Sequence, residues 1–392
     1  MAMITRQQIL EISEPFEEMY SGITNQILIM MAEYIGKDID EPIEVWQQKR
    51  IQEINLLLKH TQSIISSGGY LSTTNNTLNT VIDKTLEDIE PKLQEASKNG
   101  LLKKTTAYTA SLSINELKKN MKEDFLITFN TMGNTMQSMI LQSFNKAVNN
   151  VVSAYNTRRN EILDEATKKI MHRETMQNAV ASAIRQIAKE NIPAFIDKAG
   201  RKWTAEAYAN MYVRTNVHNL SIDTVVKRNE DYGNDLFIVS KHSGARPKCA
   251  PWQGKIVSKN NRKGTTTDAN GKKVSFIALS STSYGQADGL LGINCGHQLY
   301  PFIPKQSINN VKPLSKEQER ENKRIYEESQ RQRAIEREIR ASKTQEEMYR
   351  KAGLRDEADK QKTVTSQRQA KMRQFINETG RTRRYDREQI VK

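Results

Sequence analysis

Both cysteines of the chain and two of its five histidines fall between residues 240 and 302. These four side chains are His242, Cys249, Cys295 and His297. Zinc binds cysteine thiolates and histidine nitrogens at about 2.0–2.3 Å, usually as a tetrahedron of ligands. Cys295 and His297 are two residues apart, so an extended strand would direct both side chains to one face. The segment therefore predicts a candidate zinc site, and zinc is the only cofactor that the sequence suggests.

The spacing of the four residues leaves a second interpretation open. It matches no common zinc finger, whose paired cysteines are usually about two to four residues apart. In the alternative interpretation, all four are polar side chains that are satisfied by hydrogen bonds within a glycine-rich fold.

Several enzyme classes lack the residues that they require. A zinc deaminase needs a Glu two residues after its histidine ligand and a second cysteine after a Pro-Cys pair, and neither accompanies His242 or Cys249. A cysteine nucleophile needs a base within reach, which no spacing in the sequence indicates. The phosphate-binding Gly-x-Gly-x-x-Gly and Walker patterns are absent. The sequence therefore predicts a protein that is not an enzyme.

Two clusters of residues around these side chains carry a more specific pattern. The first cluster contains Ser240, His242, Gly244, Arg246, Pro247, Trp252, Gln253, Gly254 and Lys255, and the second contains Asn294, Cys295 and His297. Together they resemble the phage minor capsid protein 2 family, relatives of the Mu F-like head proteins. Two positions depart from that pattern: Cys249 stands where the family usually has histidine, and Gly296 where it usually has arginine. The first departure exchanges one type of zinc ligand for another, so it leaves the metal hypothesis intact.

The resemblance implies a minor structural protein of a tailed-phage head. Its partners would be the portal protein, the major capsid protein or both, and it would act in head assembly or in DNA packaging and delivery. Its location would be the virion, after synthesis in the host bacterial cytoplasm. Two alternatives stay open: a toxin-like effector or nuclease of phage origin, because Mu F-like domains are sometimes joined to toxin domains, and a zinc-dependent nucleic-acid-binding protein. The region after residue 305 contains no His or Cys, so only the preceding domain has residues for an effector's active site.

The elements that must position these residues are mostly helices. Between residues 14 and 231, Gly and Pro are sparse and apolar residues recur at helical spacing, as in Ile51, Ile54 and Leu57. Turn residues predict breaks near 36–42, 67–69, 99–100 and 191–193. After Asp235 the pattern changes to short strands, which we expect at 236–240, 255–257, 274–279 and 297–300, with an exposed hairpin loop at 260–273.

The predicted fold is therefore mainly α with a small α+β domain. We divide it into a helical region at 1–195, a last helix with the compact α+β domain at 196–305, and a charged helical arm at 306–392. The 392 residues suffice for two or three domains of about 100–200 residues each.

The arm is basic. Residues 314–392 contain 22 Lys and Arg against 15 Asp and Glu. The difference, +7, is half of the chain's net charge of +14. This excess favours contact with double-stranded DNA, whereas the alternative is a solvated helix whose charges pair with one another. Ile335 and Ile339, one turn apart, predict a thin apolar seam for a partner or for another part of the same chain, and Gly353 is expected to separate two helices.

No membrane partner is expected. No segment approaches the roughly 18 consecutive apolar residues that cross a bilayer, and the N-terminus lacks the apolar core of a signal peptide. Two cysteines are also too few for a disulfide framework. We therefore expect the chain to stay in the cytoplasm of the cell that makes it.

Overall fold

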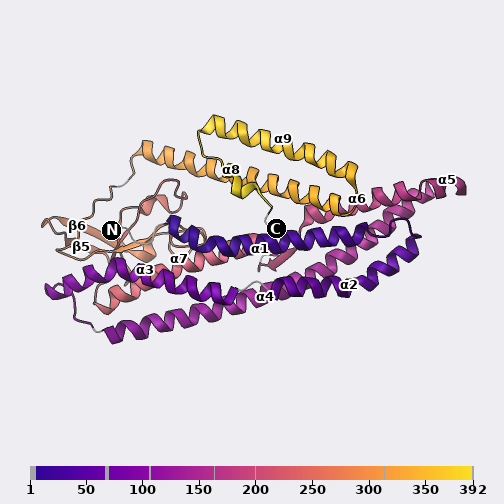
Figure 1. The fold of residues 1–392 in the computed structure, drawn as a ribbon. Coiled ribbons are helices and arrows are strands. Elements are labelled where there is room, and N and C mark those ends of the chain that lie inside the picture. The colour runs from indigo at the N-terminus through magenta and orange to yellow at the C-terminus, as the bar shows by residue number, and fades with distance from the viewer. Residues whose placement is uncertain are drawn as a thin grey trace. The chain divides into compact units, whose positions relative to one another are not determined.

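Helices dominate the structure, a computed structural model that describes residues 6–66, 70–105, 107–162, 164–198, 200–312 and 314–390 (Figure 1). The helices are α1 (Arg6–Gly36), α2 (Ile43–Ser66), α3 (Tyr70–Lys98), α4 (Ala107–Asn160), α5 (Glu165–Ile170), α6 (His172–Glu190), α7 (Ala205–Asp231), α8 (Lys316–Lys351) and α9 (Arg355–Thr379). The strands are β1 (Pro193–Ile196), β2 (Lys202–Thr204), β3 (Leu236–Val239), β4 (Ile256–Ser258), β5 (Gly264–Thr267), β6 (Lys273–Ala278) and β7 (Leu299–Pro301). The prediction of a mainly helical chain with a small α+β part is confirmed.

Three of the predicted helix breaks are confirmed. α1 ends at Gly36, α3 ends just before Asn99, and α6 ends just before Asn191. Gly100 and Asn191 have φ values of 72° and 57°, in the left-handed region that commonly ends a helix. The predicted break at 67–69 lies outside the described residues.

Two features between α4 and α7 were not predicted. The Asp164 carboxylate accepts a hydrogen bond from the Thr167 N–H at 2.8 Å and so caps the short helix α5. β1 and β2 then form an antiparallel two-stranded sheet. None of the described helices combines the length and the apolar character needed to cross a membrane.

The contacts divide the chain into two compact units, each made of three stretches. Unit 1 comprises Met1–Phe16, Tyr70–Thr128 and Asn210–Ser329, and unit 2 comprises Glu17–Gly69, Phe129–Ala209 and Gln330–Lys392. The division of the chain into three consecutive parts at 1–195, 196–305 and 306–392 stays a prediction.

Unit 1 contains a five-stranded sheet with the order β5-β6-β4-β3-β7. β4 and β6 are parallel, and the other neighbouring pairs are antiparallel. The predicted strands at 236–240, 255–257 and 274–279 are confirmed, with ends that shift by a residue or two. Two expectations were wrong: the stretch 260–273 contains β5, which pairs with β6, and the last strand starts at Leu299, so His297 precedes it.

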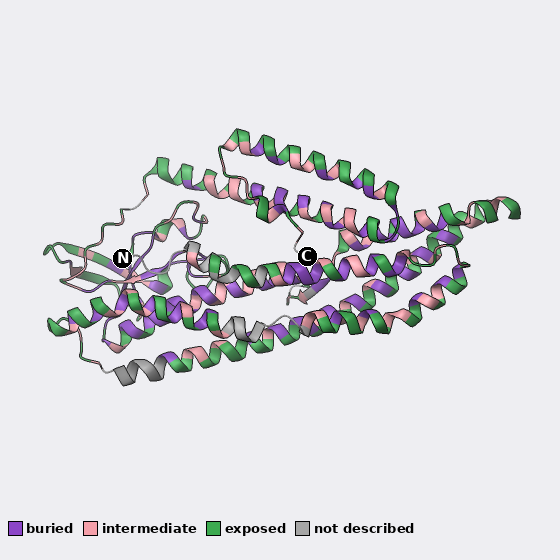
Figure 2. Ribbon diagram, viewed as in Figure 1, coloured by how far each residue is buried: buried purple, intermediate pink, exposed green. Residues whose placement is uncertain are grey.

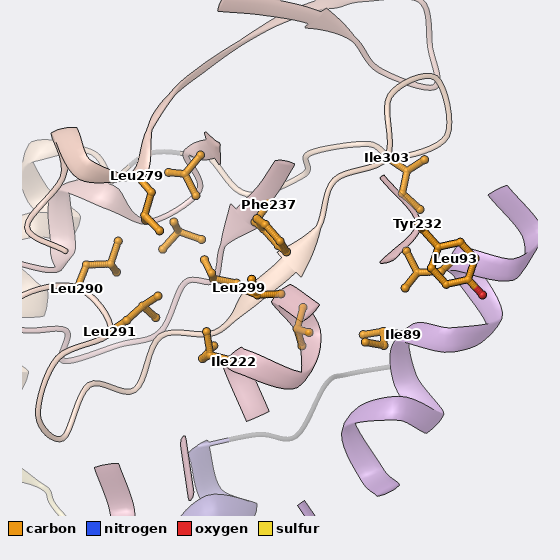
Figure 3. Close-up of a cluster of buried hydrophobic side chains, with 14 of the residues drawn as sticks. Ile89, Leu93, Ile222, Tyr232, Phe237, Leu279, Leu290, Leu291, Leu299 and Ile303 are labelled. Carbon is orange, nitrogen blue, oxygen red and sulfur yellow. The ribbon is translucent and has the colours of Figure 1, made fainter. Parts of the chain in front are cut away.

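β3 is covered on both faces. Phe237 and Val239 point into a cluster that α3 and α7 complete with side chains such as Ile89 and Ile222 (Figure 3). Leu236 and Ile238 point to the opposite face, into a second cluster. Complete burial of each such side chain stabilises the fold by about 1.5–3 kcal/mol, so this sheet is a firm base for the segments that leave its edges.

A buried ion pair joins α3 to α7. The Glu90 carboxylate accepts hydrogen bonds from Arg228 Nε at 3.0 Å and from an Arg228 terminal nitrogen at 2.7 Å. It also accepts one from the Tyr232 hydroxyl at 2.9 Å, and Arg228 donates to Asp231 at 2.6 Å. The Arg228 side chain is only 2 % exposed, so the pair fixes the two helices beneath the sheet.

Unit 2 contains α9 and the part of α8 from Gln330 onward. Ile335 and Ile339 of α8 are buried against Met372 and Phe375 of α9. Figure 2 shows buried and exposed residues alternating along the helices. The apolar seam predicted from Ile335 and Ile339 therefore finds its partner within the same chain. Gly353, with a φ of 77°, separates the two helices as predicted.

Candidate functional site

The first cysteine lies in a tight turn between β3 and β4. The Cys249 N–H donates to the Arg246 carbonyl at 2.9 Å, and the Trp252 N–H donates to the Cys249 carbonyl at 3.1 Å. A short 3₁₀ helix, Ala250–Trp252, comes directly after it. This double turn leaves the Cys249 side chain buried, with the residue 1 % exposed.

A second loop, between β6 and β7, carries the other cysteine and is held against the first. The Ser283 hydroxyl donates to the Lys248 carbonyl at 2.7 Å and accepts from the Trp252 indole N–H at 3.2 Å, both on the first loop. Gly289 allows the second loop to fold tightly, because a Cβ there would lie 1.9 Å from the Ser283 carbonyl oxygen. The two cysteine-bearing loops thus form one braced layer beside the sheet.

Three of the four predicted ligands meet where these loops touch. The sulfur atoms of Cys249 and Cys295 and a nitrogen of His297 all lie within 4.8 Å of one another. The distance from Cys295 Sγ to His297 Nδ1 is 3.4 Å. Ligands of one tetrahedral zinc ion lie about 3.3–3.8 Å apart, so the set is close to the spacing that zinc requires. Within the described ranges, no other group of three or more His, Cys, Asp and Glu residues converges in this way.

The two sulfur atoms share a proton unequally. A hydrogen bond from the Cys249 thiol lowers the pKa of Cys295, against the opposing effect of burial, and the bond to His297 lowers it further. The same sulfur–sulfur bond and burial raise the pKa of Cys249. The Leu291 N–H also donates to Cys295 Sγ, at 3.2 Å. These hydrogen bonds to the sulfur of Cys295 favour its thiolate, the form that binds metals.

His242, the fourth predicted ligand, lies outside this converged group. Its ring packs against the ring of His297 with the centroids 4.3 Å apart. Its Nδ1 is 3.0 Å from the Ser243 carbonyl, and its backbone N–H donates to Gln253 Oε1 at 2.7 Å. The assignment of all four residues to a metal stays a prediction.

A further histidine, His218 of α7, was not singled out from the sequence. Its Nε2 is 2.6 Å from the His297 carbonyl oxygen, and because a carbonyl can only accept, Nε2 carries the proton. Burial lowers the pKa of His218, so the ring is neutral and Nδ1 keeps a lone pair. That Nδ1 is buried and makes no hydrogen bond in the described part of the chain. His218 is 79 residues from His297 and stands alone on a helix, so no spacing in the sequence could have identified it.

Other residues of the two sequence clusters tie the layer to its surroundings. The Gln298 N–H donates to the Ser240 hydroxyl at 2.8 Å, and the Ser240 N–H donates to the Gln298 carbonyl at 2.9 Å. The Asn294 N–H donates to the Thr215 hydroxyl of α7 at 3.1 Å. Lys255 Nζ lies over the Trp252 ring, 5.0 Å from its centroid. Several residues of the two sequence clusters thus hold the two cysteine-bearing loops in place.

The fold and this cluster define a mainly helical protein with a small α+β part that is braced around a buried Cys–His centre. The chain belongs to the phage minor capsid protein 2 family, whose model matches residues 4–377. A structural protein of Lactococcus phage LL-H is 34 % identical over 218 residues, which cover 55 % of this chain and 56 % of that protein. A structural protein of Lactococcus phage mv4 is 34 % identical over 117 residues, 30 % of this chain and 93 % of that protein. No solved structure matches the chain.

These comparisons confirm the resemblance drawn from the two sequence clusters. The match extends far beyond those clusters and includes stretches of both units. The chain matches less than two thirds of the length of the LL-H protein.

Proposed function

We propose that this chain is a minor structural protein of a tailed-phage head that acts without catalysis. It associates with the portal or the inner capsid, and it serves head assembly or DNA packaging and delivery. It is made in the host bacterial cytoplasm and enters the virion through contacts with the portal protein, the major capsid protein or both. The observation that supports this proposal is the family match over residues 4–377.

The chemistry of the buried centre agrees with a role without catalysis. Cys295 and His297 are 7 % and 1 % exposed, so a substrate would have little access to this cysteine–histidine pair, whose side chains are of the types that serve as nucleophile and base in a thiol enzyme. The hydrogen bonds around the pair serve instead to join two loops and α7.

We also propose that the basic arm contacts packaged double-stranded DNA through one face of α9. Arg355, Lys362 and Arg373 are all exposed. They are separated by about two and three helical turns and so share one face. We call these three residues the α9 stripe. Phosphate contacts need only such positive side chains and no base-reading motif.

The basic tip after α9, residues 381–387, is a weaker candidate for DNA contact, because two of its arginines have carboxylate partners within the chain. Arg383 donates twice to Glu388, at 2.7 and 2.6 Å, and Glu388 is 1 % exposed. Arg384 pairs with Asp386 at 3.0 Å. The predicted alternative of mutually satisfied charges thus describes the tip, whereas the α9 stripe is available for phosphates.

The proposal is tested in the phage that encodes the chain, with a nonsense mutation in its gene and complementation from a plasmid. Mass spectrometry of purified particles should detect the chain in fewer copies than the major capsid protein. Without complementation we expect few heads that contain nuclease-protected DNA, while a missense change at an exposed position such as His60 should leave their number unchanged. Infectious, DNA-filled particles that lack the chain would refute a role in the head.

A further inference from the structure

We propose that Cys249, Cys295 and His297 hold a structural zinc ion, and that a nitrogen of His218 or His242 completes its coordination. This site is independent of the proposed place of the protein in the phage head. It rests on which donor atoms the fold brings together and on what each of them already bonds.

The three converged residues supply donor atoms that favour zinc over other common metal ions. Two thiolates and an imidazole favour zinc, whereas magnesium and calcium require oxygen ligands. The atoms lie within 4.8 Å of one another, although the two cysteines come from different loops and are more than forty residues apart in the sequence. Small movements of the side chains would place all three at zinc-binding distance, and the two thiolate charges would balance the charge of Zn²⁺.

Two neighbouring histidines fit the fourth position. A histidine that binds zinc usually donates its other ring nitrogen to a carbonyl or carboxylate. His218 matches this arrangement, since its Nε2 donates to the His297 carbonyl and its buried Nδ1 makes no hydrogen bond in the described ranges. His242 offers a second such geometry, because its Nδ1 lies 3.0 Å from the Ser243 carbonyl and its ring packs on that of His297.

Burial makes the site structural. Cys249, Cys295 and His297 are each at most 7 % exposed, so four protein ligands would close the coordination shell and leave no position for a substrate. The ion would join the turn after β3 to the segment that enters β7. β3 pairs with β7, the strand at one edge of the sheet, so the metal would fasten that edge.

The test uses the full chain, purified under reducing conditions without chelator, with elemental mass spectrometry as the first measurement. We expect about one zinc per chain, the stoichiometry of a single closed site. Cys249→Ser, Cys295→Ser and His297→Ala should each lose most of the metal. Cys249→His should retain it, because zinc accepts an imidazole in place of a thiolate. His60→Ala, at an exposed position in α2, is the matched control and should retain the ion.

A second measurement begins with the unaltered chain, so its first part does not depend on how the variants fold. The zinc is removed with a chelator and the protein is titrated with Co²⁺, whose thiolate charge-transfer and ligand-field absorption report tetrahedral sulfur coordination. His218→Ala or His242→Ala should weaken zinc binding at least tenfold. If both of these variants bound zinc as tightly as the unaltered chain, a closed site with a histidine as fourth ligand would be refuted.

The proposal as a whole is overturned by a chain that contains no zinc as purified and gains neither zinc nor the cobalt spectrum on titration. The interpretation of four residues satisfied by hydrogen bonds alone would then hold.

Discussion

Replacement of Glu90 by Gln should weaken the contact between α3 and α7. The carboxylate accepts four hydrogen bonds: two from Arg228, one from the Tyr232 hydroxyl and one, at 3.3 Å, from Gln94 Nε2. A Gln side chain keeps the shape but carries no charge, and its NH₂ group can only donate, so it faces the Arg228 guanidinium with a donor. Arg228 would retain Asp231 as its one charged partner.

The size of the effect depends on burial. Removal of one partner from a fully buried pair costs about 3–5 kcal/mol. The Arg228 side chain is 2 % exposed but that of Glu90 is 25 % exposed, and Asp231 remains, so we expect a smaller cost, about 2–3 kcal/mol. An exposed pair gives the contrast: Arg324 bonds to Glu321 and Glu328 on the surface of α8, and Arg324→Ala should cost less than about 1 kcal/mol.

The loss should also depend on pH. Burial would raise the pKa of Glu90, but the hydrogen bonds from Arg228 and Tyr232 and the Arg228 charge together lower it below its ordinary value of 4.5. A carboxylate whose pKa is lowered in the folded state stabilises the fold fully above pH 4.5, and that contribution disappears as the pH falls through the lowered pKa. Glu90→Gln should therefore differ most from the natural chain near pH 7 and converge with it in acid.

Hydrogen exchange measured by mass spectrometry on peptides from α3 and α7 is the assay, because it reports opening of these helices rather than of the whole chain. Peptides from unit 2 serve as an internal reference. Faster exchange in α3 and α7 by a factor of about 30–150 corresponds to the expected 2–3 kcal/mol. Exchange no faster than in Arg324→Ala, or a difference that persists unchanged below pH 4, would refute the role assigned to the pair.

Two further outcomes depend on single contacts. A Cβ on Gly36 would lie 2.5 Å from the Ala352 Cα, so Gly36→Ala should destabilise unit 2 by about 1–3 kcal/mol, measured by urea unfolding. The control is Gly133→Ala, whose Cβ would meet Ile65 at an ordinary 3.4 Å and which should be neutral or slightly stabilising. Equal effects of the two substitutions on stability would contradict the close approach of Gly36 to Ala352. Reversal of the three charges in the α9 stripe should weaken duplex DNA binding in a filter assay and reduce the slope of log affinity against log salt by about 0.9 for each lost phosphate contact, and an unchanged slope would remove α9 from the DNA-binding surface.

The fold was predictable where a pattern is local and unpredictable where a distant partner decides. Asn191 and Gly100 marked helix ends because their own backbones take left-handed φ values. β5 was missed because its sequence, Gly264 to Thr267, has no apolar alternation, and only pairing with β6 makes it a strand. The start of β7 was misplaced for a similar reason, since its register is set by β3.

The same distinction explains the candidate site. Cys295 and His297 were expected to converge because they would lie on a strand. They do converge, with Cys295 Sγ 3.4 Å from His297 Nδ1, but in the segment before β7 rather than in a strand. Cys249 arrives from another loop, and the bonds of Ser283 that bring it there involve Lys248 and Trp252, which no spacing rule connects to the second cysteine.

His218 links α7 to the centre in a way that does not require a metal. Its one bond to the centre is to the main chain of His297, so α7 holds the backbone of the second loop even without zinc. A bound ion would add a second connection between the same elements, through the side chains. Loss of zinc should then loosen the segments that carry the two cysteines. The hydrophobic cluster of β3, α3 and α7, which Leu290 and Leu291 of the second loop also enter, should stay packed, because none of the candidate ligands belongs to it. The double loop is therefore the part of unit 1 whose order metal could control, and the sheet beneath it is the part whose order the apolar core alone secures.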